Sequence, residues 1–277
     1  DRRPLPGVGN TLGMVVDNRR IERAKDAMLQ RDIADRHQER RPILIERHQR
    51  DDDEVVEMKL DEAAGEMDHR RRAGQQSHTG GGGAQPPAVV ELYTSEGCSS
   101  CPPADRWASK LKGRSDVLVL GFHVNYWDKL GWPDRFANAA TTERQHLLQR
   151  VSGAPYVYTP QVVMNGKDLR GWSGASVQRL PASPVTVALA RDGNSVRATV
   201  GASAPQRLAG YWAVLEDGHS SRVKAGENSG ETLAHDHVVT LYQPVPSWSA
   251  ASDAASFTLN LPAATPKSRR VAFVVTD

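Results

Sequence analysis

Apolar residues form short runs of two kinds in the second part of the chain. Ala88–Thr94 and Val117–Val124 are nearly continuous apolar runs rich in β-branched residues. Such runs are typical of strands that are covered on both faces, as in parallel α/β sheets. Ala104–Lys112 and Thr141–Val151 instead carry apolar side chains at helical spacing. The sequence therefore predicts two strands that alternate with two helices.

A third strand and a hairpin follow the second predicted helix. Gln161–Met164 has strand character, and Asn165-Gly166 directly after it is a strong signal for a two-residue hairpin turn. The turn leads into a short strand at Lys167–Arg170. A short helix is expected at Ala175–Leu180, and it should end before Pro181.

Beyond Pro184 the pattern indicates strands only. Turn residues such as Asp217-Gly218 separate six short apolar runs, and this spacing favours a small antiparallel sandwich or barrel. The six expected strands are Val185–Ala190, Val196–Ala202, Gly210–Glu216, His237–Tyr242, Phe257–Leu261 and Val271–Thr276. A domain boundary is expected near residues 181–184, which gives an α/β domain over 86–182 and a β-rich domain over 183–277.

Residues 1–85 differ in composition from the rest of the chain. They hold 17 acidic and 16 basic residues, and all Trp, Tyr and Phe lie beyond them. Such a segment has little apolar surface to offset the entropy lost on ordering. Glycines 80–83 and Pro86-Pro87 then resemble a linker. Three interpretations remain open: a disordered extension, an interaction arm, or a start site assigned too far upstream.

The overall charge and hydropathy exclude some classes of partner. The chain has 35 basic and 33 acidic residues, a balance that does not indicate a nucleic-acid or membrane-surface partner. No apolar run approaches the roughly 20 residues of a transmembrane helix. No secretory signal is visible at Asp1, because no apolar stretch follows a basic start.

Two cysteines carry the strongest chemical signal. Cys98 and Cys101 are the only cysteines of the chain and lie between a predicted strand and a predicted helix. Unpaired amides and the helix dipole favour a thiolate at the first cysteine of such a pair, which makes it the nucleophile. The second can attack the mixed disulfide and release the product. This position of a C-x-x-C pair predicts a thioredoxin-like redox site, with Ser99 and Ser100 as candidate substrate contacts.

Two other roles for the cysteines remain open. A copper or zinc site could use both thiolates with a histidine, such as His235 or His237, since soft thiolates favour these metals. A structural zinc site usually needs four protein ligands, however, and a second C-x-x-C pair is missing. A purely structural disulfide is the third interpretation, although so short a loop removes little chain entropy.

Further candidates follow from position. A cis bond is predicted at Thr159-Pro160, which opens the third strand, and would leave the backbone of Thr159 to pair with a substrate. Glu91, inside the first strand, could take the proton of Cys101, or could face solvent at an edge. His123 and Asp128 follow the second strand, where polar residues could contact a substrate or instead only bond to backbone.

Three runs of the sequence resemble one bacterial family. The runs are VVELYTSEGCSSCPPAD (Val89–Asp105), FHVNYWDKLGW (Phe122–Trp132) and YTPQVVMNG (Tyr158–Gly166). Together they are similar to DUF1223, a family of secreted, thioredoxin-like proteins of unknown function. The similarity extends to Gly226–Asn228 and the region of His235. It implies a thioredoxin-like fold and export to the periplasm or beyond, but no established substrate.

These features combine into one leading hypothesis. The chain is expected to be a thiol–disulfide oxidoreductase, with Cys98 as nucleophile and Cys101 as resolving thiol. Its partners would be protein thiols or disulfides, without a bound cofactor, a resident metal, nucleic acid or a membrane span. Metal handling and a binding module without catalysis are the alternatives.

Overall fold

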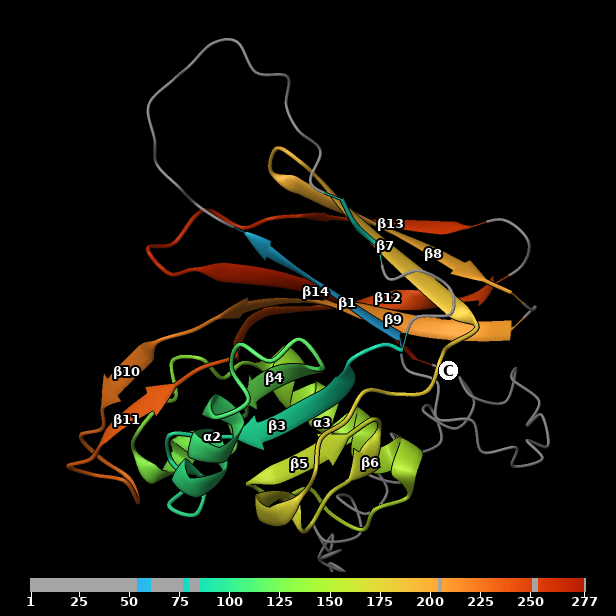
Figure 1. The fold of residues 1–277 in the computed structure, drawn as a ribbon. Coiled ribbons are helices and arrows are strands. Elements are labelled where there is room, and N and C mark those ends of the chain that lie inside the picture. The colour runs from blue at the N-terminus through green and yellow to red at the C-terminus, as the bar shows by residue number, and fades with distance from the viewer. Residues whose placement is uncertain (1–53, 61–76, 80–84, 204–205, 251–253, 277) are drawn as a thin grey trace, which may run out of the picture. The chain divides into compact units, whose positions relative to one another are not determined.

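The computed structural model describes residues 54–60, 77–79, 85–203, 206–250 and 254–276 (Figure 1). The first half of this part contains helices and strands in alternation. They are β3 (Ala88–Thr94), α2 (Pro102–Ser109), β4 (Val117–His123), η1 (Asp128–Leu130), α3 (Ala139–Ser152), β5 (Gln161–Met164), β6 (Lys167–Asp168) and η2 (Trp172–Gly174).

The second half contains strands only. They are β7 (Val185–Asp192), β8 (Ser195–Ala202), β9 (Gln206–Glu216), β10 (His219–Arg222), β11 (Thr232–His235), β12 (Val238–Ala250), β13 (Ala255–Asn260) and β14 (Arg269–Thr276). Two strands lie before residue 85, β1 (Glu54–Leu60) and β2 (Ser77–Thr79). All six strands expected beyond residue 184 are present, and β10 and β11 were not predicted.

One mixed sheet joins strands from both halves, in the order β1-β14-β9-β12-β4-β3-β5-β6. Strands β3 and β4 are parallel, with Ala88 opposite Val117 and Thr94 opposite His123. At the junction β12 runs parallel to β4, while β9 pairs antiparallel with both β12 and β14. The carboxyl ends of β3 and β4 therefore lie side by side.

The predicted fold class is wrong. A thioredoxin-like α/β domain followed by a separate small β domain requires two independent sheets, whereas β9, β12 and β14 continue the sheet of β3 to β6. The described part is mostly β, with only two α-helices. Gly121 allows the junction: its amide donates to the carbonyl oxygen of His237 at 2.7 Å, and a Cβ at position 121 would lie 3.0 Å from that oxygen.

The two faces of the main sheet are covered by different elements. Strand β3 alternates, with Val90 and Leu92 packed among the residues of α2 and with Val89 and Tyr93 in the core on the opposite face. Helix α3 adds Leu148 to that opposite face. Figure 1 shows α2 and α3 on either side of β3 and β4.

A second sheet completes a sandwich over the other end of the main sheet. Its order is β13-β8-β7-β2. Trp212 and Phe273 of the main sheet share a buried core with Leu189, Val196 and other residues of the second sheet. The two sheets pack face to face here, but the second sheet lies against strands that extend the first sheet and does not form a separate sandwich-like domain.

Several local predictions can be compared with the structure. The Asn165-Gly166 turn is confirmed, with φ of +50° and +75° at the two residues. Ala175–Leu180 is not helical, and only the short η2 precedes it. A disordered extension was one of three interpretations of residues 1–85, and within this segment β1 pairs with β14 and β2 with β7. Most of the other residues of that segment lie outside the described part.

No helix of the described residues is long and apolar enough to cross a membrane.

Candidate functional site

A disulfide joins Cys98 and Cys101 at the start of α2. The loop before the helix is a series of tight turns, in which the Cys98 amide donates to Ser95 O and the Cys101 amide to Cys98 O. Prolines fill the first two helical positions, where a missing N–H removes no intrahelical bond. The first helical amides, those of Ala104 and Asp105, donate to Cys101 O. The sequence thus places the pair at the amino end of a helix.

The disulfide is covered in this structure. Neither Cys98 nor Cys101 has exposed surface, whereas Ser99 and Ser100 between them are exposed. Because both side chains are equally buried, solvent exposure does not show which of the two cysteines is the attacking thiol. A thiolate that attacks either sulfur first needs the loop or its cover to move.

The loop between β10 and β11 holds the disulfide loop by hydrogen bonds. The Asn228 side-chain amide donates to the carbonyl oxygens of Glu96 and Cys98, both at 2.9 Å. The Glu227 carboxylate accepts the amide of Ser99 at 3.0 Å and its hydroxyl at 2.8 Å. We term residues 227–228 the clamp. They hold the disulfide loop although Glu227 is 128 residues from Ser99 in the sequence.

We expect Glu227→Ala to increase the rate at which dithiothreitol reduces the disulfide by about threefold, because two hydrogen bonds that hold the loop closed are lost. The rate can be followed by quenching and thiol labelling. Glu231→Ala is the matched control, since Glu231 is an exposed carboxylate of the same loop region. Equal rates for the wild type and both variants would show that the clamp does not restrict access.

Behind the loop lies a buried acid–histidine cluster of Glu96, His123, Asp134 and His235. The Asp134 carboxylate lies 2.6 Å from His123 Nδ1 and accepts the Glu96 amide at 2.8 Å. Glu96 accepts the Trp132 indole N–H at 2.7 Å, and its other oxygen lies 3.2 Å from His235 Nε2. The two imidazole rings are 4.9 Å apart. All four residues of the cluster are buried.

The charged forms of the side chains in the cluster are stabilised by their neighbours. Burial disfavours a charged His123, but the Asp134 carboxylate more than offsets this, so the pKa of His123 is raised. Burial also disfavours a charged Asp134, yet His123 and two backbone amides lower its pKa. The pKa of Glu96 is lowered as well, because hydrogen bonds that include one from His235 outweigh its burial.

Asp105 is a carboxyl group in the first turn of α2, next to Cys101. It lies four residues further along α2, so both side chains project from the same side of the helix. Its carboxylate accepts the Thr94 hydroxyl at 3.1 Å. Burial raises its pKa, and nearby His235 and His123 only partly reverse this. A carboxyl with a raised pKa is a better proton donor and acceptor than an ordinary aspartate as the pH approaches neutral.

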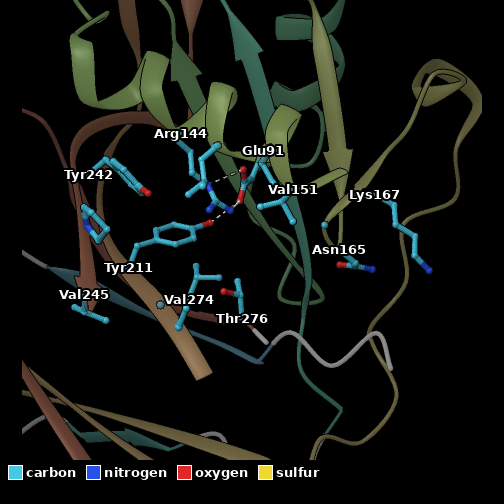
Figure 2. A pocket seen from close by; sticks show the side chains of 16 residues that line it. Glu91, Arg144, Val151, Asn165, Lys167, Tyr211, Tyr242, Val245, Val274 and Thr276 are labelled. Carbon is cyan, nitrogen blue, oxygen red and sulfur yellow. Dashed lines mark hydrogen bonds and ion pairs between the residues drawn. The ribbon is translucent and has the colours of Figure 1, made fainter. Parts of the chain in front are cut away.

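Glu91 does not lie under the dithiol, which corrects its predicted role. It projects from β3 on the α3 side, away from α2, because its strand neighbours Val90 and Leu92 face α2. Arg144 Nη2 donates to it at 2.7 Å and the Tyr211 hydroxyl donates at 2.7 Å (Figure 2). The Tyr93 hydroxyl also donates to it. It is buried, so the alternative of a solvent-facing edge is also wrong.

The Thr159-Pro160 bond is cis, as predicted. Trp127 connects this bond to the disulfide loop. Its indole N–H donates to Thr159 Oγ1 at 2.8 Å, and its Cβ lies 3.0 Å from where a side chain at Gly97 would begin. The structure thus brings Thr159 and the cysteine loop to one place. The substrate-binding role of Thr159, Pro160, Ser99 and Ser100 stays a prediction.

The other sequence candidates have identifiable contacts. Asp128 accepts the backbone amide of Asp134 at 3.0 Å and so shapes the loop that carries the partner of His123. His235 ends β11, while His237 precedes β12 at a φ of +58°, so the two do not share a strand face. Arg270 Nη2 lies 2.9 Å from His237 Nδ1. Burial of the His237 ring and, to a smaller extent, the positive charge of Arg270 lower the pKa of His237 to about 4.

Sequence reasoning missed five residues of this site: Glu96, Asp105, Asp134, Glu227 and Asn228. Two of them, Glu96 and Asp105, lie close to the cysteines in the sequence, and their spacing from the cysteines could have identified them. Asp105 follows Cys101 by one helical turn, which a helical projection would have shown. The described residues contain no group of three His, Cys, Asp or Glu side chains arranged to hold a metal ion.

The chain was compared with known proteins. The family model described as "Protein of unknown function (DUF1223)" matches residues 89–276. A crystal structure of protein AGR_C_4864 from Agrobacterium tumefaciens is 31% identical, covers 64% of this chain and 80% of its own, and has a TM-score of 0.49. HBP35 of Porphyromonas gingivalis is 16% identical, covers 69% of each chain, and has a TM-score of 0.47.

No curated protein matches the chain. The matched family region begins within β3 and ends in β14, so it includes the disulfide, the cluster and the clamp. The protein belongs to the DUF1223 family, whose function is unknown.

Proposed function

We propose that the protein is a thiol–disulfide oxidoreductase that acts on cysteines of other proteins through Cys98 and Cys101. The observation that carries the proposal is the Cys98–Cys101 disulfide at the first turn of α2, one helical turn from the Asp105 carboxyl. A bridge over so short a loop contributes little to stability. The amino end of a helix, in contrast, stabilises a thiolate.

The exchange proceeds in two displacements. A substrate thiolate attacks Sγ of Cys98, the Cys98–Cys101 bond breaks, and Cys101 leaves as a thiolate. A second substrate thiolate then attacks the substrate sulfur of the mixed disulfide, and Cys98 leaves. Two substrate thiols thus lose two electrons and become one disulfide, while the protein disulfide is reduced to two thiols. The same steps in reverse reduce a substrate disulfide.

Asp105 supplies the proton for Cys101 in this scheme. The leaving thiolate of Cys101 is buried, and a buried thiolate without a partner is unfavourable. An Asp105 carboxyl that is protonated can give its proton to that thiolate and recover it in the reverse direction. The cysteines would remain oxidised in a compartment such as the periplasm or the extracellular space, which fits the observed disulfide.

The test combines a reduction potential with single-cysteine variants. Equilibration with glutathione should give a potential above about −300 mV, the range of exchangeable disulfides. Cys101→Ser should accumulate a mixed disulfide when its free Cys98 thiolate attacks a disulfide substrate, with one substrate thiol leaving, and Cys98→Ser should abolish exchange. A potential below this range, together with no exchange in the wild type, would show that the disulfide is structural.

The role of Asp105 has a separate readout. Asp105→Asn should slow exchange by about 10²-fold or more at neutral pH and change the pH profile of the rate, because a proton donor is lost. Asp236→Asn, a change of another partly buried carboxyl near α2, is the control. An unchanged pH profile in Asp105→Asn would remove Asp105 from the mechanism while leaving the cysteine roles intact.

A further inference from the structure

A pocket of about 460 Å³ lies between α3 and the main sheet, on the face opposite α2 (Figure 2). A volume of this size is within the range of small-molecule sites. None of the residues that line the pocket takes part in the exchange proposed above. An occupant of this pocket would therefore belong to a second function of the chain.

Helix α3 turns one largely apolar face toward the pocket. Its lining residues are Arg144, Leu147, Leu148 and Val151. The last three follow the first by three, four and seven residues, and this spacing places all four on one side of the helix. Such a face normally packs against a sheet, but Leu147 and Val151 are 40% and 79% exposed. Exposed apolar side chains that line a pocket commonly mark a binding site.

The charged groups inside the pocket are satisfied by one another. Glu91 and Arg144 form an ion pair at 2.7 Å, and their side chains are 6% and 10% exposed. The carboxylate accepts two N–H groups of this arginine and the hydroxyls of Tyr93 and Tyr211. A carboxylate has about four acceptor positions, so those of Glu91 are all used. A cationic ligand group placed beside Glu91 would therefore find no acceptor there.

A negative ligand group is also disfavoured in the inner pocket. A second carboxylate would lie near Glu91, and the Arg144 charge that could offset the repulsion is already paired. Lys167 also lines the pocket, but it is engaged in an interaction of its own, so its charge gives no reason to expect an anionic ligand. The inner pocket therefore favours an uncharged group.

The inner wall offers aromatic surface and hydrogen-bond donors. The ring centres of Tyr211 and Tyr242 lie 5.3 Å apart, and the Arg144 guanidinium lies 4.6 Å from the ring centre of Tyr211. The bonds to Glu91 use only part of the N–H groups of this guanidinium, so Arg144 can also donate to a neutral carbonyl oxygen.

We propose that this pocket binds an uncharged single-chain molecule with a carbonyl head, such as a medium-chain ketone or ester. The carbonyl oxygen accepts from the guanidinium of Arg144. The apolar chain lies between α3 and the strands, against Leu148 and Val274, and extends past Leu147 and Val151 toward solvent. This binding is separate from the exchange at the cysteines.

Isothermal titration of the full chain with 2-hexanone, 2-octanone and 2-decanone tests the proposal. Each added CH₂ should strengthen binding about fourfold, since a buried CH₂ is favourable by a nearly constant amount. 2-Decanone should bind at least about tenfold more tightly than decanoate or decyltrimethylammonium, because each ion would bring an unpaired charge into the pocket. Equal or tighter binding of either ion, or affinity that does not depend on chain length, would overturn the proposal.

Two variants with matched controls locate the site. Thr276→Trp, a change at a partly exposed lining residue of β14, should weaken 2-decanone binding at least about tenfold by filling the pocket. Thr199→Trp is its control, since Thr199 is a partly exposed residue of β8 outside the pocket lining. Leu147→Glu should weaken binding about threefold by placing a charge beside the chain. Leu130→Glu is its control, because Leu130 is 41% exposed and does not line the pocket.

Three results would refute the site. They are undetectable binding of 2-decanone to the wild type, equal affinity in Thr276→Trp and wild type, and equal losses in Leu147→Glu and Leu130→Glu. A dimer in sedimentation that Leu147→Glu dissociates would assign the exposed apolar face of α3 to a second copy of the chain instead. The exchange assay is unaffected by each of these results, so the two functions are tested separately.

Discussion

Replacing Arg144 by methionine is expected to lower the free energy of unfolding by about 3–5 kcal/mol. The change removes the cation from a buried ion pair and leaves the Glu91 carboxylate without it, although the hydroxyls of Tyr93 and Tyr211 remain. Burial disfavours a charged Glu91, and Arg144 more than offsets this in the native protein, where the pKa of Glu91 is lowered. Urea denaturation monitored by circular dichroism measures the effect.

Arg150→Met is the matched control for this change. Arg150 lies on the same helix and pairs with Glu143, but both side chains are more than half exposed, so the loss should stay below about 1 kcal/mol. The double variant Arg144→Met/Glu91→Leu should recover part of the lost stability, because no charge is left buried alone. Similar losses for Arg144→Met and Arg150→Met would contradict the assigned importance of the buried pair.

Asp134→Asn is expected to lower the free energy of unfolding by about 3 kcal/mol near pH 5, and to change its pH dependence. The substitution keeps the shape of the side chain but leaves a charged His123 beside a neutral partner in a buried site. Glu96 and Asp105 are the other carboxylates that act on His123. They limit the loss but make no close pair with the ring among the described contacts.

The pH window follows from the two pKa directions. His123 has a raised pKa in the folded state, so its contribution is fully present below its ordinary value of 6.5 and is lost as the pH rises through the folded pKa. Asp134 has a lowered pKa, so its contribution is present above 3.8 and is lost as the pH falls through the folded pKa. The difference between wild type and Asp134→Asn should therefore be largest between about pH 4 and 6.5. A difference that does not change with pH would contradict a charged pair.

The clearest error of sequence reasoning concerned one strand. The run VLVLGFH predicted β4 correctly, but the prediction gave Gly121 within it no role. Glycine inside a strand often marks the close approach of another backbone, and here it admits the turn at His237. That contact joins β12 to β4 and so merges the two expected domains into one sheet.

Glu91 shows the same limit at the level of a side chain. Of the two interpretations of Glu91, a buried carboxyl and a solvent-facing one, the structure shows the buried one, but its pKa is lowered and not raised. Which face it would occupy depends on the strand's register relative to α2, and a one-residue change in alternation exchanges the two faces. Its partners Arg144 and Tyr211 lie 53 and 120 residues away, and no local pattern connects them to it.

The sequence by itself determined the cysteine pair at a strand-to-helix turn, the cis Thr159-Pro160 bond, the Asn165-Gly166 turn and most strand positions. These depend on local propensities and on short spacings. The order of strands in the main sheet, the hydrogen bonds of Glu227 and Asn228 to the disulfide loop, and the pairing of His123 with Asp134 and of Glu96 with His235 follow from the tertiary structure alone. These depend on contacts between segments that are distant in sequence, where packing and the need to satisfy buried polar groups select one arrangement among many that the same local elements allow.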